Sequence, residues 1–338
     1  MYASGVHARP VLLLTILLAA CGGDDDATPA MDAGHPDAGH DAGPVIVDAG
    51  RDATAPVDAA LDAPPSMIPY DVDGPVPYTM EVQHVTDDGG DTFDVTVWMP
   101  STPGPHPAVS FSCGSTQTAA GYVPYGQRLA SYGIAMFLAD DPGVFTNTGD
   151  IVPHAEYVVH TWIPATYPQI DTTKIGLGGH SRGGAVSLLT AEHLRGEVVA
   201  WAGLDPVDNE FLMAPREYAR TNLSMIGIPT VFLGAEVESN CAPAADSWPT
   251  LFPLAPDPTV LLLGLGAGHV QYELPSACTG CGACSPNGTV PDDVVLAYAV
   301  RYFTAFFARE LLGDTTVGAM FEGAGAPEDV AAGLIEVR

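Results

Sequence analysis

The chain has 338 residues, of which 47% are hydrophobic, and a formal net charge of −30. This length and apolar content are enough for a substantial folded core. With only 11 Lys and Arg residues, the chain has too little positive charge to neutralise nucleic-acid phosphates, so we expect no nucleic-acid partner.

Residues 1–20 have the pattern of an export signal. A weakly basic start precedes the apolar run VLLLTILLAA at residues 11–20, which is too short to span a bilayer. The run ends in LAAC, which resembles the lipobox of bacterial lipoproteins and would place the acyl chains on Cys21. We therefore expect an exported bacterial lipoprotein on the outer membrane, facing the periplasm or the cell surface. An ordinary signal peptide with a coincidental cysteine is the alternative.

Residues 21–66 differ in composition from the rest of the chain. They are dominated by Asp, Ala, Gly and Pro, and they include the local repeat DAGHPDAGHDAG. Such a segment buries too little apolar surface to offset its conformational entropy, and its like charges repel one another. We expect a disordered tether that holds a folded domain, residues 67–338, away from the membrane.

The folded domain alternates predicted strands and helices. Residues 78–85 and 93–100 alternate apolar and polar side chains, which is typical of paired strands. Continuous apolar runs predict strands buried on both faces at residues 107–114, 133–140, 174–179, 198–205, 229–236 and 259–266. Helices are expected at residues 122–132, 154–166, 184–194 and 292–313. This order predicts a mostly parallel sheet covered on both faces, which binds ligands at the carboxyl ends of its strands.

The stretch GHSRGG contains the pattern G-x-S-x-G around Ser181. A predicted buried strand runs directly into it and a predicted helix follows, which is the context in which a nucleophilic serine occupies a strained turn. Gly179 and Gly183 then avoid collisions with the adjacent strand and helix. A glycine turn with a helix-capping serine is the structural alternative.

From about residue 78 to residue 313 the chain resembles the α/β-hydrolases. Similarity to chlorophyllase-like enzymes lies in the stretches GHSRGG, GLDPVDN and NCAP. A resemblance to bacterial cutinases and polyester hydrolases lies in IDTTKIGLGGHS and LASYGIAMFLADD. The resemblance implies the α/β-hydrolase fold, with a mostly parallel central sheet and helices on both faces. It also implies a serine esterase. Only about twenty residues separate Asp205 from the next predicted strand, so we also expect no large lid.

A serine nucleophile needs a base, and His269 in GAGHVQYE is the best candidate. It follows the last predicted strand, as the hydrolase chain order of serine, acid and histidine requires. The order or position is wrong for four other histidines of the domain, His154, His160, His180 and His193.

Two carboxylates compete for the role of the triad acid. Asp205 ends the strand after Ser181, and its DPVD context resembles the chlorophyllase acid site; an N-cap is its structural alternative. Glu238 follows the next strand, where cutinases keep an aspartate. We favour Asp205, with Glu238 as the alternative and Asp208 as a further candidate.

Two backbone amides are candidates for the oxyanion hole. One belongs to Arg182, directly after the nucleophile, and the other to Ser115 after the strand at 107–114. Gly114 allows a close backbone approach, whereas Cys113 stands where related families place His or Pro.

Beyond Cys21, the domain contains Cys113 and a group of four cysteines, Cys241, Cys278, Cys281 and Cys284. In an exported protein two disulfides within the group are favoured, with Cys113 as a buried thiol. The sequence leaves the pairing open. Because C-x-x-C spacing also suits zinc, a zinc site is the alternative.

The sequence therefore predicts a monomeric serine carboxylic-ester hydrolase that forms an acyl-enzyme and needs no cofactor or metal. Without a large lid, its cleft should be open and suited to bulky, lipidic or polymeric esters. The alternative from another class is a catalytically inactive surface-binding protein of the same fold, stabilised by zinc or by disulfides.

Overall fold

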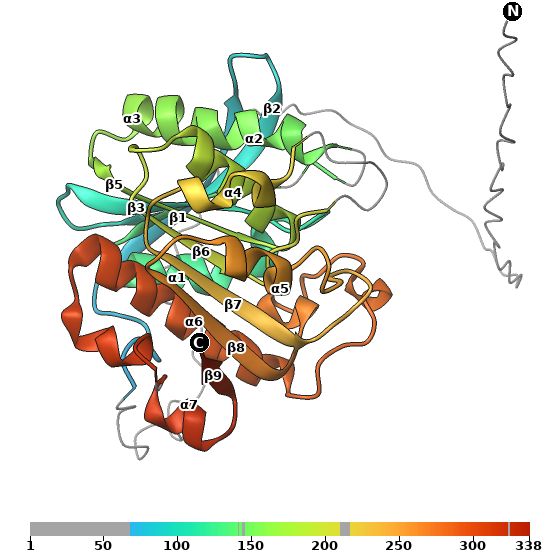
Figure 1. Cartoon of the computed structure of the whole chain (residues 1–338). Helices are drawn as coiled ribbons and strands as arrows, with labels where there is room; N and C mark the ends of the chain where they lie inside the picture. The colour runs from blue at the N-terminus through green and yellow to red at the C-terminus, as the bar shows by residue number, and fades with distance from the viewer. Residues whose placement is uncertain (1–67, 141, 144–145, 210–216, 324) are drawn as a thin grey trace, which may run out of the picture. The chain divides into compact units, whose positions relative to one another are not determined.

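A nine-stranded sheet forms the centre of the part of the chain that the structure describes (Figure 1). The computed structural model describes residues 68–140, 142–143, 146–209, 217–323 and 325–338. The predicted signal peptide, Cys21 and the predicted tether lie outside these residues.

The strands lie in the order β1-β2-β4-β3-β5-β6-β7-β8-β9. Neighbours from β4 through to β8 pair in parallel, whereas β1, β2 and β9 are joined to the sheet by antiparallel pairing. The predicted mostly parallel α/β sheet is thereby confirmed. The strands are β1 Tyr78–Thr86, β2 Thr92–Pro100, β3 His106–Ser112, β4 Ala135–Ala139, β5 Ile170–His180, β6 Ala200–Leu204, β7 Thr230–Val237, β8 Thr259–Gly268 and β9 Ile335–Val337.

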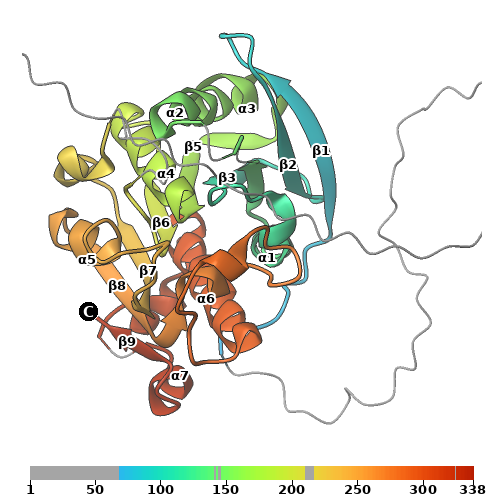
Figure 2. The same ribbon diagram turned by 90° about the vertical axis from the view of Figure 1, so that its right-hand side faces the viewer.

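Helices cover both faces of the sheet (Figures 1 and 2). On one face α1 and α6 pack over a core that includes Trp98, Phe111 and Phe303; on the other, α2 and α4 pack over Trp201 and Phe232. No helix in the described part of the chain is long and apolar enough to cross a bilayer. The α-helices are α1 Val123–Ser131, α2 Thr148–Tyr157, α3 Ile163–Thr166, α4 Arg182–His193, α5 Trp248–Leu251, α6 Asp292–Phe307 and α7 Pro327–Ala331.

One predicted helix begins earlier than its apolar pattern indicates. The helix expected at residues 154–166 starts at Thr148, because the Asn147 side chain accepts a hydrogen bond from the Gly149 amide and caps it. Pro153 lies inside its second turn, and the chain continues through one π-helical turn into α3. A side-chain cap therefore outweighs the turn-like composition of this segment.

Candidate active site

The turn between β5 and α4 holds Ser181 in a strained backbone conformation, with φ of 54° and ψ of −127°. A conformation of this kind costs a non-glycine residue about 1–3 kcal/mol. A Cβ on Gly179 would lie 2.1 Å from the Gly183 carbonyl oxygen, and one on Gly183 would lie 2.1 Å from the Ser112 carbonyl oxygen. Both glycines are thus required by backbone that passes directly beside them, as the sequence pattern predicts.

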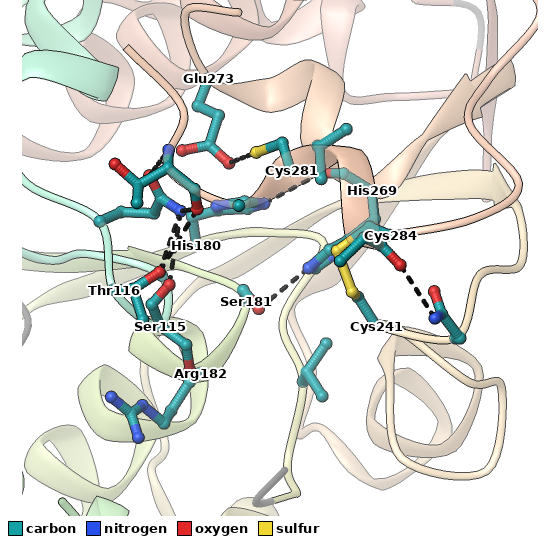
Figure 3. A pocket seen from close by; sticks show the side chains of 18 of the residues that line it. Ser115, Thr116, His180, Ser181, Arg182, Cys241, His269, Glu273, Cys281 and Cys284 are labelled. Atoms are coloured by element: carbon teal, nitrogen blue, oxygen red, sulfur yellow. Dashed lines mark hydrogen bonds between the residues drawn. A yellow bond between two sulfur atoms is a disulfide. The ribbon is translucent and has the colours of Figure 1, made fainter. Parts of the chain in front are cut away.

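Ser181, His269 and Asp205 form a hydrogen-bonded chain at the carboxyl edge of the sheet (Figure 3). His269 follows β8 and Asp205 follows β6, and both side chains are buried. The Asp205 Oδ2 atom lies 2.7 Å from His269 Nδ1, and the Ser181 Oγ atom lies 2.9 Å from His269 Nε2. Because the carboxylate only accepts, it places the imidazole proton on Nδ1 and leaves Nε2 able to accept the serine proton.

The two alternative acids have other partners. Glu238 accepts a hydrogen bond from the Ala244 amide at 2.9 Å. Asp208 accepts from the amides of Ala219 and Arg220 and forms an ion pair with the Arg220 guanidinium. The remaining oxygen of Asp205 accepts from the Ala235 amide at 2.9 Å, which fixes that carboxylate beside the imidazole. The structure therefore brings Asp205 to His269.

A pocket of about 370 Å³ lies beside Ser181. Ser115 and Arg182 both line it, so the structure places the two predicted oxyanion residues next to the serine (Figure 3). The Arg182 side chain donates to the carbonyls of Gly143 and Thr146, and Arg182 is the first residue of α4. Its backbone amide therefore lies at a helix N-terminus, where the helix dipole favours negative charge.

A second buried network, which the sequence did not reveal, joins two segments of the site. One is the turn around Ser181, residues 179–183, which we call the elbow, and the other is the loop after β3. The Gly114 amide donates to the Tyr122 hydroxyl at 3.1 Å, which donates to His180 Nδ1 at 2.8 Å. His180 Nε2 donates to the His269 carbonyl at 3.0 Å. Burial, and next the neighbouring His269, hold the pKa of His180 well below its usual range, so the ring is neutral. The network ties the Gly114 loop to the segment that carries the base.

The four clustered cysteines form two disulfides, Cys241–Cys284 and Cys278–Cys281. The first joins the loop after β7 to the loop after His269, over a sequence separation of 43. Cys241, Cys281 and Cys284 line the pocket beside Ser181, while Cys113 is buried and belongs to neither bond. The cysteine loop is thus one wall of the pocket.

Glu273 is a buried acid that sequence reasoning missed. Only 1% of its surface is exposed, and burial raises its pKa to about 8. The one sequence signal is a lone acid flanked by Tyr272 and Leu274, four residues after the predicted base. The raised pKa favours the protonated form of this carboxyl at neutral pH.

The pKa of Glu273 predicts a stability that falls as pH rises. An unfolded chain loses this proton near pH 4.5 and the folded chain only near pH 8, so between these values the unfolded state binds fewer protons. The wild type should therefore lose unfolding free energy on the order of 3 kcal/mol between pH 5 and pH 8. We expect Glu273→Gln to lack this loss. Urea denaturation without reductant measures it, and Glu328→Gln, at an exposed position, is the control. An unchanged pH dependence in Glu273→Gln would contradict the assignment.

No family model matches the chain. Cutinase 2 of Thermobifida cellulosilytica is 25% identical to it over 240 residues, which span 68% of this chain and 80% of that protein. Cutinase cut1 of Thermobifida fusca is also 25% identical over 240 residues, spanning 68% of this chain and 66% of that protein, just under two thirds. The predicted resemblance to cutinases is confirmed: the chain is a distant homologue of the Thermobifida cutinases, with the mostly parallel sheet and interleaved helices of an α/β-hydrolase.

Proposed function

We propose that the protein is a serine carboxylic-ester hydrolase. The observation that carries this proposal is the hydrogen-bonded chain from Asp205 through His269 to Ser181, at the carboxyl edge of the sheet. A serine hydroxyl is a weak nucleophile until a base removes its proton, and His269 Nε2 lies within reach. The homology to cutinases supports the same reaction class.

In the proposed mechanism, Ser181 Oγ attacks the ester carbonyl carbon as His269 takes its proton. Asp205 stabilises the imidazolium that forms, and the amides of Ser115 and Arg182 stabilise the oxyanion. His269 then protonates the leaving alcohol, which leaves an acyl-enzyme on Ser181. A water molecule, deprotonated by the same imidazole, releases the acid.

We propose bulky, lipidic or polymeric esters as the substrates. The Thermobifida relatives are named cutinases. Apolar side chains that face the pocket include Val207, Pro243 and Val270, which suit an acyl or aromatic group. Between β6 and β7 the described chain forms only single-turn helices, Ala219–Thr221 and Leu223–Met225. Since residues 210–216 lie outside the described part, the absence of a large lid stays a prediction.

Hydrolysis of an ester panel tests the proposal: p-nitrophenyl esters of increasing acyl length, polyester film and chlorophyll. We expect turnover of the p-nitrophenyl esters and of at least one bulky substrate. Failure to hydrolyse any ester, combined with stoichiometric bound zinc, would instead support an inactive binding protein of this fold.

The Tyr122 network predicts a positioning effect on the reaction. Tyr122→Phe removes the acceptor of the Gly114 amide and the donor to His180. We expect kcat to fall about tenfold with KM little changed, because the Ser115 amide of the Gly114 loop loses its orientation but is still present. Tyr125→Phe is the matched control, because its buried hydroxyl donates to the Tyr272 carbonyl, away from His180. Equal kcat values for the two variants would contradict a positioning role.

We also propose that Cys21 is lipidated and anchors the protein to the outer membrane. The proposal depends on the apolar run that ends in LAAC. Expressed in a bacterium, the full chain should sediment with the membrane fraction, and Cys21→Ser should abolish labelling by radioactive palmitate. Labelling that persists in Cys21→Ser would contradict it.

A further inference from the structure

The Cys278–Cys281 disulfide lies against a buried carboxyl group in the wall of the pocket. Glu273 Oε1 is 3.0 Å from Cys278 Sγ and 3.2 Å from Cys281 Sγ (Figure 3 shows the second contact). Both cysteines are partly exposed, and the two residues between them, Thr279 and Gly280, are exposed. The bond is therefore reachable from solvent on one side and touches an acid on the other.

The environment of the other disulfide differs. Cys241–Cys284 joins two loops across a sequence separation of 43, whereas Cys278–Cys281 closes a separation of 3 within one turn. A long cross-link restricts the unfolded chain much more than a short one does. The short bond thus contributes little to the stability of the fold. It is also the bond whose two sulfur atoms both contact a carboxyl group.

We propose that Cys278 and Cys281 form a thiol–disulfide exchange site that takes small-molecule thiols, with Glu273 as its proton donor and acceptor. Cys281 lines the pocket, so its sulfur is the one that an incoming thiol meets. This activity is distinct from ester hydrolysis and uses none of Ser181, His269 or Asp205.

The exchange proceeds in two balanced steps. A thiolate attacks Cys281 Sγ, the bond between the two cysteines breaks, and the Cys278 thiolate leaves and takes the Glu273 proton. A second thiolate then attacks the external sulfur of the mixed disulfide and releases the Cys281 thiolate. That thiolate and the Glu273 carboxylate take up the protons that the two reductant thiols gave to solvent. In sum, two thiols become one external disulfide, and the protein gains a dithiol.

The groups around Glu273 leave its proton available for this role. The titratable side chains that face it from the helical segment after β3 are the phenols of Tyr122 and Tyr125, and burial raises the pKa of both well above the usual value. They stay neutral, so the Glu273 carboxyl, with a pKa of about 8, is the proton source near neutral pH.

Reduction would also alter the substrate pocket, a consequence that rests on the proposed function. The Thr279 carbonyl accepts from Gln117 Nε2 at 2.8 Å, and the Thr279 amide donates to Gln117 Oε1 at 3.0 Å. Gln117 follows the Ser115 loop and lines the pocket. Opening the disulfide loosens the turn that holds this side chain.

The test exposes the full chain, purified without reductant, to graded reduced glutathione, traps thiols with N-ethylmaleimide and locates them by peptide mass spectrometry. We expect Cys278 and Cys281 to be labelled at thiol concentrations that leave Cys241–Cys284 intact. At pH 7, Glu273→Gln should slow the exchange about tenfold, and the difference should shrink above pH 8 as Glu273 ionises.

Glu238→Gln, at an exposed carboxylate near Cys241, is the matched control and should exchange like the wild type. Three results would overturn the proposal: labelling of Cys241 and Cys284 first, an unchanged rate in Glu273→Gln at pH 7, or stoichiometric zinc on Cys278 and Cys281. Because labelling does not depend on ester turnover, failure to hydrolyse esters would count against the proposed function alone.

Discussion

Replacing Ser181 with alanine should lower kcat for p-nitrophenyl butyrate by about 10⁴-fold or more. The hydroxyl is the nucleophile of the proposed mechanism, and no neighbouring group in the Asp205–His269 chain replaces it. Residual turnover would come from binding and from the oxyanion amides. Alanine keeps the Cβ and the strained backbone of the elbow, so the fold should be preserved. Initial rates and circular dichroism of the same sample separate the two effects.

Ser187→Ala is the matched control for this variant. Ser187 is a buried serine of α4, the helix that follows Ser181, and its hydroxyl donates to the Gly184 carbonyl and accepts from Trp201 Nε1. Its loss should cost stability while kcat stays near the wild-type value. A Ser181→Ala variant that keeps a tenth of the wild-type rate would mean that another group performs the attack.

Asp205→Asn should lower kcat about 10³–10⁴-fold, the second-largest effect that we expect. An amide nitrogen facing His269 Nδ1 favours the tautomer with its proton on Nε2, which then cannot accept the proton of Ser181. The buried geometry changes little, because Asn has the shape of Asp. Rates measured at pH 8 with one p-nitrophenyl ester are sufficient to show it.

Glu238→Gln tests the competing assignment in the same assay. Its carboxylate accepts from the Ala244 amide, so the variant should stay within about twofold of the wild-type rate. A loss in Glu238→Gln equal to that in Asp205→Asn would show that the loop after β7 moves to bring Glu238 to the imidazole in solution.

The elbow could be predicted because its determinants are local. A buried strand, two obligatory glycines around one serine and a following helix lie within a short stretch of sequence. The position of the base required more, since His269 lies 88 residues from Ser181. Its place after the last parallel strand brought it to the same sheet edge, where the carboxyl ends of parallel strands meet.

The choice of acid could not be made from sequence for a geometric reason. Asp205 and Glu238 follow β6 and β7, which are neighbours in the sheet, so each lies near the same edge. The two carboxylates differ in their hydrogen-bond partners. Asp205 accepts from the Ala235 amide and is held beside the imidazole, whereas Glu238 accepts from the Ala244 amide. Such contacts depend on loop conformation, for which the sequence carried no readable pattern.

Tyr122 and Glu273 were missed for a related reason. An isolated tyrosine in a helix and an isolated acid in a loop have no motif, and their meeting depends on how α1 packs beside the segment after β8. The cysteine pairing was likewise open, because four cysteines allow three pairings. Only the fold shows that Cys241 reaches Cys284 across two loops.

Covalent labelling by a fluorophosphonate tests the central claim most directly, since the reagent reacts with a serine that a neighbouring base activates. The proposed mechanism predicts one adduct per chain, located on Ser181 by peptide mass spectrometry and absent after His269→Ala. An unlabelled folded protein, or an adduct on any other residue, would contradict it.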